Sequence, residues 1–516
     1  MRRKVPLFGL VVAAAAALLP LSPAGATTAA PAKGTIAWSP CPEDANVECG
    51  TLSVPVDWSR PNGPTVDLAL ARRKATDPSA RAGSLLINPG GPGGSGVDFA
   101  LFGDQYFSKE INSRFDIVGF DPRGVARSHP IVCSTDLLRQ APYPIMKSQA
   151  DFDRQLAYNS RLRADCRART GPLYDHVDTL SVVRDLDAIR AALGEDKLTY
   201  YGISYGTLIG QLYAETFPER VRALALDGNM DHSLHTRGFL DTEAATVQDS
   251  FDEFVSWCDR EASCALHGRD VRAFWAGLLA RADRGELHFP GQPEAPLTRL
   301  DLIGMATGAF YGPAWAELAR FLNDVDTGTA AAPFTLRSPK RDADVTEYPT
   351  QVFCEDFSLP VHDYREYAAL LRRSARIAPD MRFSPLALSM TTSCLGQPTP
   401  IPNPQHHLRV HGSAPLLLGN SVHDPATAYS WAVSSARQIG REATLLTYDG
   451  WGHGIYGHSD CTTGTIDSYL VSLALPARGT HCPAVEPPAQ LKAQRPPLPL
   501  PPGPLPAVPG WGLPRS

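Results

Sequence analysis

The chain has 516 residues, of which 43% are hydrophobic and 20% charged, and its formal net charge at pH 7 is -6. This composition is typical of a globular protein long enough to bury a large core and an inserted second unit. Because the balance is acidic and no basic run occurs beyond the first residues, the chain is not expected to bind nucleic acid.

The N-terminus has the pattern of a secretory signal peptide, which we place at residues 1–26. Arg2-Arg3-Lys4 is a basic start, residues 5–19 are apolar, and Ala24-Gly25-Ala26 is a small-residue cleavage site. The apolar run is about 15 residues long, whereas a membrane span requires roughly 20. We therefore expect no integral membrane segment once this peptide is removed. Residues 27–40 follow as a flexible leader.

The cysteines agree with export to an extracellular location, either secreted or associated with the cell wall. There are ten, an even number, and none shows C-x-x-C spacing, which disfavours zinc and redox sites. The sequence leaves their connectivity open, and pairing in chain order is the simplest expectation. That order gives the disulfides Cys41–Cys49, Cys133–Cys166, Cys258–Cys264, Cys354–Cys394 and Cys461–Cys482.

Short buried strands alternate with helices over residues 41–230 and again over residues 412–482. This alternation predicts an α/β fold with a mostly parallel, doubly wound sheet in two segments. After antiparallel strands at residues 50–58 and 65–71, strands are expected at residues 84–88, 115–120, 197–201, 221–226, 414–419 and 444–448. Helices are expected at residues 181–193, 207–214, 426–438 and 462–473.

Residues 231–411 change to a helical pattern with little strand signal. Amphipathic helices are expected at residues 239–258, 271–282, 315–325 and 363–377. This stretch is predicted to be a helical cap domain inserted after a sheet strand. Residues 483–516 are rich in proline and lack periodicity, so we expect an extended, disordered tail.

The most informative motif is Gly202-Ile203-Ser204-Tyr205-Gly206, which has the form G-x-S-x-G. A β-prone segment precedes it and a segment with helical spacing follows it. A sharp strand-to-helix turn would expose the serine hydroxyl over the end of the sheet, and glycines are needed where a Cβ would clash. The pattern predicts a nucleophilic Ser204. The alternative is an ordinary serine in a glycine-rich turn.

A serine nucleophile needs a base to take its proton and an acid to orient that base. The loops after two later predicted strands supply both residues, Asp424 as the acid and His453 as the base. Asp227 also follows a strand and could be the acid in a variant arrangement. The other nearby alternatives are His423, Asp449, His458 and Asp460.

A glycine-rich loop, residues 88–96, follows the strand that ends at Asn88. Its glycines let backbone N–H groups approach a substrate oxygen, so the loop is expected to form an oxyanion hole. The expected donors are the N–H groups of Tyr205 and Gly91, with Gly90 as the second choice. A phosphate loop is disfavoured because no Gly-Lys-Ser/Thr follows. This chemistry requires no metal and no cofactor.

Together with Asp121-Pro122-Arg123-Gly124, these motifs resemble the secreted tripeptidyl-aminopeptidase-like branch of the α/β-hydrolases, relatives of proline iminopeptidase. The resemblance extends from about Cys41 to Cys482 and includes the late cysteines of the TAP-like C-terminal region. It departs at Asn88-Pro89, where proline iminopeptidases carry a histidine, and in the proline-rich tail. Arg123 is expected to tie loops together and not to be catalytic.

The resemblance implies an α/β-hydrolase fold and a serine hydrolase. The expected activity is an aminopeptidase that releases short peptides, of tripeptidyl or prolyl type. The alternative is a carboxylesterase or lipase-like hydrolase of uncharged acyl substrates. An aminopeptidase must bind an α-ammonium group, and the family resemblance suggests Glu355 and Asp356, after Cys354, for this role. A solvated pair on a loop is the alternative. The expected partner is a peptide or small acyl substrate, and a monomer is the simplest oligomeric state.

Overall fold

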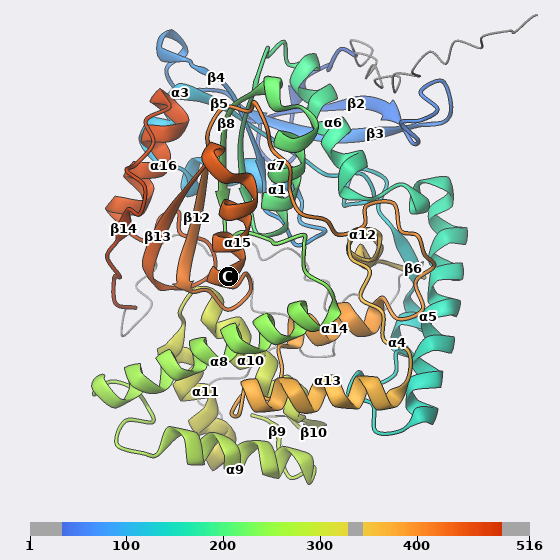
Figure 1. The fold of residues 1–516 in the computed structure, drawn as a ribbon, viewed down its shortest axis with the longest axis vertical. Coiled ribbons are helices and arrows are strands. Elements are labelled where there is room, and N and C mark those ends of the chain that lie inside the picture. The colour runs from blue at the N-terminus through green and yellow to red at the C-terminus, as the bar shows by residue number, and fades with distance from the viewer. Residues whose placement is uncertain (1–33, 291, 329–343, 488–516) are drawn as a thin grey trace, which may run out of the picture. The chain divides into compact units, whose positions relative to one another are not determined.

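The computed structural model describes residues 34–290, 292–328 and 344–487 (Figure 1). The predicted signal peptide and residues 488–516 of the predicted tail lie outside the described residues. A sheet of ten strands has the order β1-β2-β3-β5-β4-β7-β8-β12-β13-β14. Its strands are β1 (Ser39–Pro40), β2 (Glu48–Pro55), β3 (Thr65–Arg73), β4 (Gly83–Asn88), β5 (Phe115–Phe120), β7 (Leu198–Ile203), β8 (Val221–Asp227), β12 (Leu416–His423), β13 (Ala443–Trp451) and β14 (His481–Cys482).

The sheet is antiparallel at its N-terminal edge and parallel elsewhere. β1, β2, β3 and β5 pair in antiparallel fashion, and the strands from β5 to β14 along the sheet pair in parallel. Every residue of β4, β5 and β7 is buried, as expected for strands covered on both faces. The predicted mostly parallel sheet is confirmed. The expectation that residues 27–40 form a flexible leader is wrong at its end, because residues 39–40 form β1 and pair with β2.

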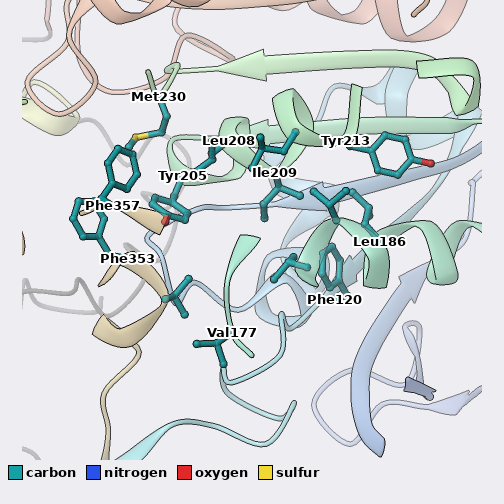
Figure 2. Close-up of a cluster of buried hydrophobic side chains, with 14 of the residues drawn as sticks. Phe120, Val177, Leu186, Tyr205, Leu208, Ile209, Tyr213, Met230, Phe353 and Phe357 are labelled. Carbon is teal, nitrogen blue, oxygen red and sulfur yellow. The ribbon is translucent and has the colours of Figure 1, made fainter. Parts of the chain in front are cut away.

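Helices cover both faces of the sheet, and the side chains of the strands alternate between two cores. On β8, Leu224 and Leu226 belong to one core, and Ala223 and Ala225 belong to the other. The first core, part of which Figure 2 shows, includes side chains of α6 (Thr179–Ala192), α7 (Tyr205–Thr216) and α15 (Tyr429–Ile439). The second includes side chains of α1 (Gly96–Leu101), α3 (Lys109–Arg114) and α16 (Asp460–Ser472).

The residues between β8 and β12 are mainly helical, and many of them share a third buried core that contains Phe251, Trp275, Phe310 and Trp315. The four helices predicted in this stretch are present. The elements are α8 (Thr236–Arg260), α9 (Val271–Asp283), β9 (His288–Phe289), β10 (Gln292–Pro296), α10 (Arg299–Tyr311), α11 (Trp315–Thr327), β11 (Val345–Glu347), α12 (Thr350–Asp356), α13 (Tyr364–Ile377) and α14 (Pro385–Ser393). The short strands β9, β10 and β11 were not expected in this stretch, where the sequence shows little strand signal.

Several elements outside this stretch were also not predicted. They include the short helices α1 and α3, the strand β14, α2 (Gly103–Tyr106), β6 (Val132–Ser134), α4 (Thr135–Arg139) and the long α5 (Gln149–Thr170). β6 pairs with β11, which joins a segment near α5 to the segment before α12. Among the described helices, none is long and apolar enough to cross a membrane.

Covalent and ionic links fix distant segments of the chain. Disulfides join Cys41–Cys49, Cys133–Cys166, Cys258–Cys264, Cys354–Cys394 and Cys461–Cys482, the pairs that chain order suggests. The fully buried guanidinium of Arg123 donates to both carboxylate oxygens of Asp185 at 2.6 Å and to the carbonyl oxygen of Val56. Such a bidentate pair holds the loop after β5 against α6 and the end of β2.

Candidate active site

Ser204 occupies the turn between β7 and α7. Its φ is 57° and its ψ is -124°, a conformation that typically costs a residue with a Cβ about 1–3 kcal/mol. Glycines make the turn possible. A Cβ on Gly202 would lie 2.5 Å from the carbonyl oxygen of Gly206, and a Cβ on Gly206 would lie 2.8 Å from that of Asn88. The structure therefore has the strand–serine–helix turn that the G-x-S-x-G pattern predicts.

Asp424 and His453 form a hydrogen-bonded pair in the loops that follow β12 and β13. Nδ1 of His453 lies 3.0 Å from each carboxylate oxygen of Asp424. The His453 side chain is 9% exposed and that of Asp424 is 0% exposed. Burial opposes the charged imidazolium, but the charge and hydrogen bond of Asp424, with the charge of Asp227, raise the pKa of His453 above 6.5. The ring is therefore suited to accept a proton.

Thr427 fixes the carboxylate of Asp424 and was not anticipated from the sequence. The backbone N–H groups of Ala426 and Thr427 donate to one carboxylate oxygen at 2.8 and 2.9 Å, and Oγ1 of Thr427 donates to the other at 2.9 Å. The same hydroxyl lies 3.3 Å from Nδ1 of His453. Aspartate side chains commonly accept the backbone N–H two residues on, which could have indicated the contact with Ala426 but not the one with the Thr427 hydroxyl.

None of the alternative acids and bases is joined to another candidate in the way that Asp424 is joined to His453 among the described residues. Asp449 contacts His481, and His423 contacts Asp249. Burial lowers the pKa of His458 to about 4. The remaining two alternatives are Asp460, the first residue of α16, and Asp227, whose carboxylate accepts backbone N–H groups of the loop after β13. Of the candidate residues that the sequence offers, Asp424 and His453 are the acid–base pair that the structure joins.

The serine turn and the histidine loop meet at the end of β8. The N–H of Ser204 donates to the carbonyl oxygen of Asp227 at 2.9 Å. A Cβ on Gly228 would lie 3.2 Å from Cε1 of His453. Oγ of Ser204 has no hydrogen-bond partner among the described residues, and hydrogen bonds between catalytic groups commonly tighten only when substrate binds.

The glycine-rich loop after β4 lies directly against the serine turn. A Cβ on Gly90 would lie 2.4 Å from the carbonyl oxygen of Ile203 and 2.8 Å from the nitrogen of Tyr205. The N–H of Gly90 already donates to Oδ1 of Asn88 at 2.9 Å. Across the part of the chain that is described, the N–H of Gly91 has no acceptor, and Tyr205 is the first residue of α7, where an N–H has no partner within the helix. This arrangement favours Gly91 over Gly90 as a donor.

The family comparisons agree with this geometry. Residues 83–322 match the family described as alpha/beta hydrolase fold, and residues 379–482 match the one described as TAP-like protein. The chain is 34% identical to the serine protease Hip1 of Mycobacterium tuberculosis, over 87% of this chain and 91% of Hip1. The chain belongs to the TAP-like branch of the α/β-hydrolases. As a member of that family it is a serine hydrolase.

Two further relatives of this TAP-like hydrolase carry different names. The tripeptidyl aminopeptidase of Streptomyces coelicolor is 31% identical, over 87% of this chain and 86% of that protein. Carboxylesterase B of Mycobacterium tuberculosis is also 31% identical, over 85% of this chain and 87% of that protein. Peptidase and esterase names therefore both occur at this level of identity.

Glu355 and Asp356 are not a solvated pair on a loop, which was the alternative to amine binding. They lie at the buried C-terminal end of α12, at 2% and 0% exposed. The carboxylate of Glu355 accepts from the N–H of Val177 and the amide of Gln351, both at 3.0 Å. That of Asp356 accepts hydrogen bonds from donors of three residues: Thr179, Asn403 and Tyr205.

These contacts do not support the expectation that Glu355 and Asp356 bind a substrate amine, because donors from the protein already occupy both carboxylates. Burial raises the pKa of Glu355 well above its usual range and that of Asp356 to about 7. The hydrogen bond from Tyr205 instead ties α12 to the serine turn, and the rings of Phe353 and Phe357 lie beside Tyr205 (Figure 2).

One face of α8 lies on the loops that carry Asp424 and His453. Its residues at positions 243, 246, 249 and 253 share that face. Thr246 donates to the carbonyl oxygen of Asp424, and Glu253 accepts from the indole N–H of Trp451. Glu243 is 0% exposed, accepts from Oγ of Ser384 at 2.6 Å, and has one carboxylate oxygen without a donor among the described residues. Burial and the charge of Asp424 raise the pKa of Glu243 to about 8.

Proposed function

We propose that this serine hydrolase is a secreted aminopeptidase that releases short peptides, of tripeptidyl or prolyl type, from free N-termini. The observation that carries the proposal is the Asp424–His453 pair beside the strained turn of Ser204. We assign Ser204 as the nucleophile, His453 as the general base and Asp424 as the residue that orients and stabilises the imidazolium. The N–H groups of Gly91 and Tyr205 are assigned to the oxyanion hole.

In the proposed reaction, Oγ of Ser204 attacks the carbonyl carbon of the scissile bond while Nε2 of His453 takes the hydroxyl proton. The negative charge on the former carbonyl oxygen is stabilised by the two backbone N–H groups. His453 then donates its proton to the leaving nitrogen, the C–N bond breaks, and an acyl-enzyme ester remains on Ser204. Water, deprotonated by His453, hydrolyses this ester and restores the free serine.

The preference for peptides is supported by relatives named serine protease and tripeptidyl aminopeptidase. The test compares a tripeptide p-nitroanilide that has a free N-terminus with its N-acetylated twin. A charge-assisted contact to an α-ammonium group is worth roughly 1.5–3 kcal/mol, so acetylation is expected to lower kcat/KM by about ten- to a hundredfold. Equal kcat/KM values for the two substrates would contradict the proposed aminopeptidase activity.

A second candidate function is an esterase for uncharged acyl substrates. It is favoured because protein donors already occupy the carboxylates of Glu355 and Asp356, which were the expected binding groups for a substrate amine. A relative named carboxylesterase B also favours it. This function predicts that p-nitrophenyl butyrate is a better substrate than either peptide. Under both functions, Glu355→Gln is expected to change stability and to leave the ratio of free to acetylated turnover unchanged.

Secretion is supported by the five disulfides, because such bonds persist in oxidising compartments. The test is to locate the protein in fractions of the culture that produces it. We expect the mature chain in the medium or the cell-wall fraction, with its N-terminus near residue 27. Recovery in the cytoplasm with an intact N-terminus would contradict secretion.

A further inference from the structure

Asp227, the last residue of β8, contacts both segments that carry the proposed nucleophile and base. It is 1% exposed, and its backbone carbonyl accepts the N–H of Ser204 at 2.9 Å. Its carboxylate accepts the N–H of Ile455 at 2.8 Å through one oxygen and the N–H of Tyr456 at 3.0 Å through the other. A single residue therefore holds the serine turn at one end and the loop of His453 at the other.

The position of β8 in the sheet explains this double contact. β8 lies between β7, which leads into Ser204, and β12, which leads to Asp424, so its end lies at the centre of the site. The close approach continues at the next residue, where a Cβ on Gly228 would lie 3.2 Å from Cε1 of His453. Asp227 does not replace Asp424, because its carboxylate receives backbone N–H groups and not the imidazole.

We propose that Asp227 is a positioning residue that sets the spacing between Ser204 and His453 and places a second negative charge near the imidazole. The inference rests on the proposed function, since it assumes that Ser204 and His453 react together. An aspartate suits this role because one carboxylate can accept two backbone N–H groups at once, whereas an amide would turn a donor toward one of them.

The groups that face the Asp227 carboxylate agree with a charge held there. From β7, the hydroxyl of Tyr201 donates to it at 2.8 Å, and the hydroxyl of Tyr106 lies 2.8 Å from that of Tyr201. From the loop after β13 come His453 and the two N–H groups. None of the lysine or arginine side chains in the described ranges pairs with it. Burial raises the pKa of Asp227 to about 6, against the effect of these donors, and the charge of Asp227 raises the pKa of His453.

The test measures the labelling of the full chain by a fluorophosphonate probe between pH 5 and 9. In this reaction the Oγ–P bond of Ser204 forms, the P–F bond breaks, fluoride leaves and His453 takes the serine proton. Asp227→Asn is expected to slow labelling about 10- to 100-fold, as a small misplacement of reacting groups does. It is also expected to move the pH midpoint of labelling downward, because a buried negative charge near His453 is lost. The final extent of labelling should equal that of the wild type.

A merely structural role would lower the final extent of labelling and leave the rate and the pH midpoint of the folded fraction unchanged. That outcome, or a wild-type rate and midpoint in Asp227→Asn, would overturn the proposal. A wild-type chain that is not labelled at Ser204 would instead overturn the proposed function. The two failures are therefore distinguishable.

If Asp227→Asn does not fold, Tyr201→Phe decides the question. This variant keeps the carboxylate and removes one of its donors, and we expect labelling to be several-fold slower. The matched control is Tyr469→Phe. It removes a buried hydroxyl that also contacts β8, at the N–H of Leu224 and away from the site, and should label at the wild-type rate. Equal rates in the two tyrosine variants would overturn the role of Asp227.

Discussion

His453 and Asp424 face each other symmetrically, with Nδ1 of the ring 3.0 Å from each of the two carboxylate oxygens. A carboxylate at Nδ1 favours the tautomer that carries its proton there, which leaves Nε2 free to act as a base. The geometry of the carboxylate therefore decides the chemistry of the ring. Whatever holds Asp424 in place should affect turnover.

Thr427 is the side chain that holds Asp424, and Thr427→Val removes its hydroxyl while keeping its shape. Losing a hydrogen bond to a charged group costs roughly 1.5 kcal/mol, so we expect kcat/KM to fall about tenfold in a variant that still folds. Steady-state kinetics on the preferred substrate checks this. Thr427→Ser keeps the hydroxyl and should retain most of the activity. A valine variant as active as the wild type would show that the backbone N–H groups suffice.

The pH dependence of kcat/KM should follow His453. The proposed reaction requires the neutral ring, and the pKa of His453 is raised above 6.5. Activity should therefore fall as the pH decreases through a midpoint above 6.5. A pH–rate profile whose acid midpoint lies at or below pH 6.5 would contradict this effect of Asp424 and Asp227 on the pKa of His453.

Gly90→Ala should disable the oxyanion loop. The added Cβ would lie 2.4 Å from the carbonyl oxygen of Ile203, and the φ of Gly90 is 84°, which disfavours alanine. We expect kcat to fall at least about a hundredfold, the effect of losing one oxyanion donor. Gly277→Ala in α9 is the control, because nothing lies within 4 Å of its Cβ position. If the two variants retain equal activity, the loop does not contribute to the reaction.

Glu243 should make the stability of the protein decrease as the pH rises. Its pKa is about 8 in the folded chain and near 4.5 when unfolded. Between these values the unfolded chain binds fewer protons, so the free energy of unfolding should decrease by roughly 1.4 kcal/mol per pH unit. Glu243→Gln should remove this part of the decrease, as measured by urea midpoints between pH 5 and 8. Parallel curves for wild type and variant would contradict the prediction.

The positions of Ser204, Asp424 and His453 could be predicted from the sequence because each follows a strand whose apolar run is local and readable. The same holds for the glycine loop, whose residues are contiguous. Strand lengths were less accurate. β12 continues to His423 and β13 to Trp451, into residues expected to be loop, because the two strands keep pairing past a register shift.

Features that depend on distant partners could not be predicted. α5 was missed because its buried face includes the polar residues Gln155 and Asn159, and Asn159 donates to the carbonyl oxygens of Thr392 and Leu395, more than 230 residues later. The role expected for Glu355 is unsupported for the same reason, since its donor Val177 is 178 residues away. No local pattern indicates such contacts.

The nucleophile assignment is tested most directly by mapping the site of fluorophosphonate labelling in the full chain by mass spectrometry. We expect one adduct, on the peptide that contains Ser204. We also expect no adduct in Ser204→Ala and greatly slowed labelling in a folded His453→Ala variant. An adduct on another residue, or wild-type labelling in Ser204→Ala, would contradict the assignment of Ser204 as the nucleophile.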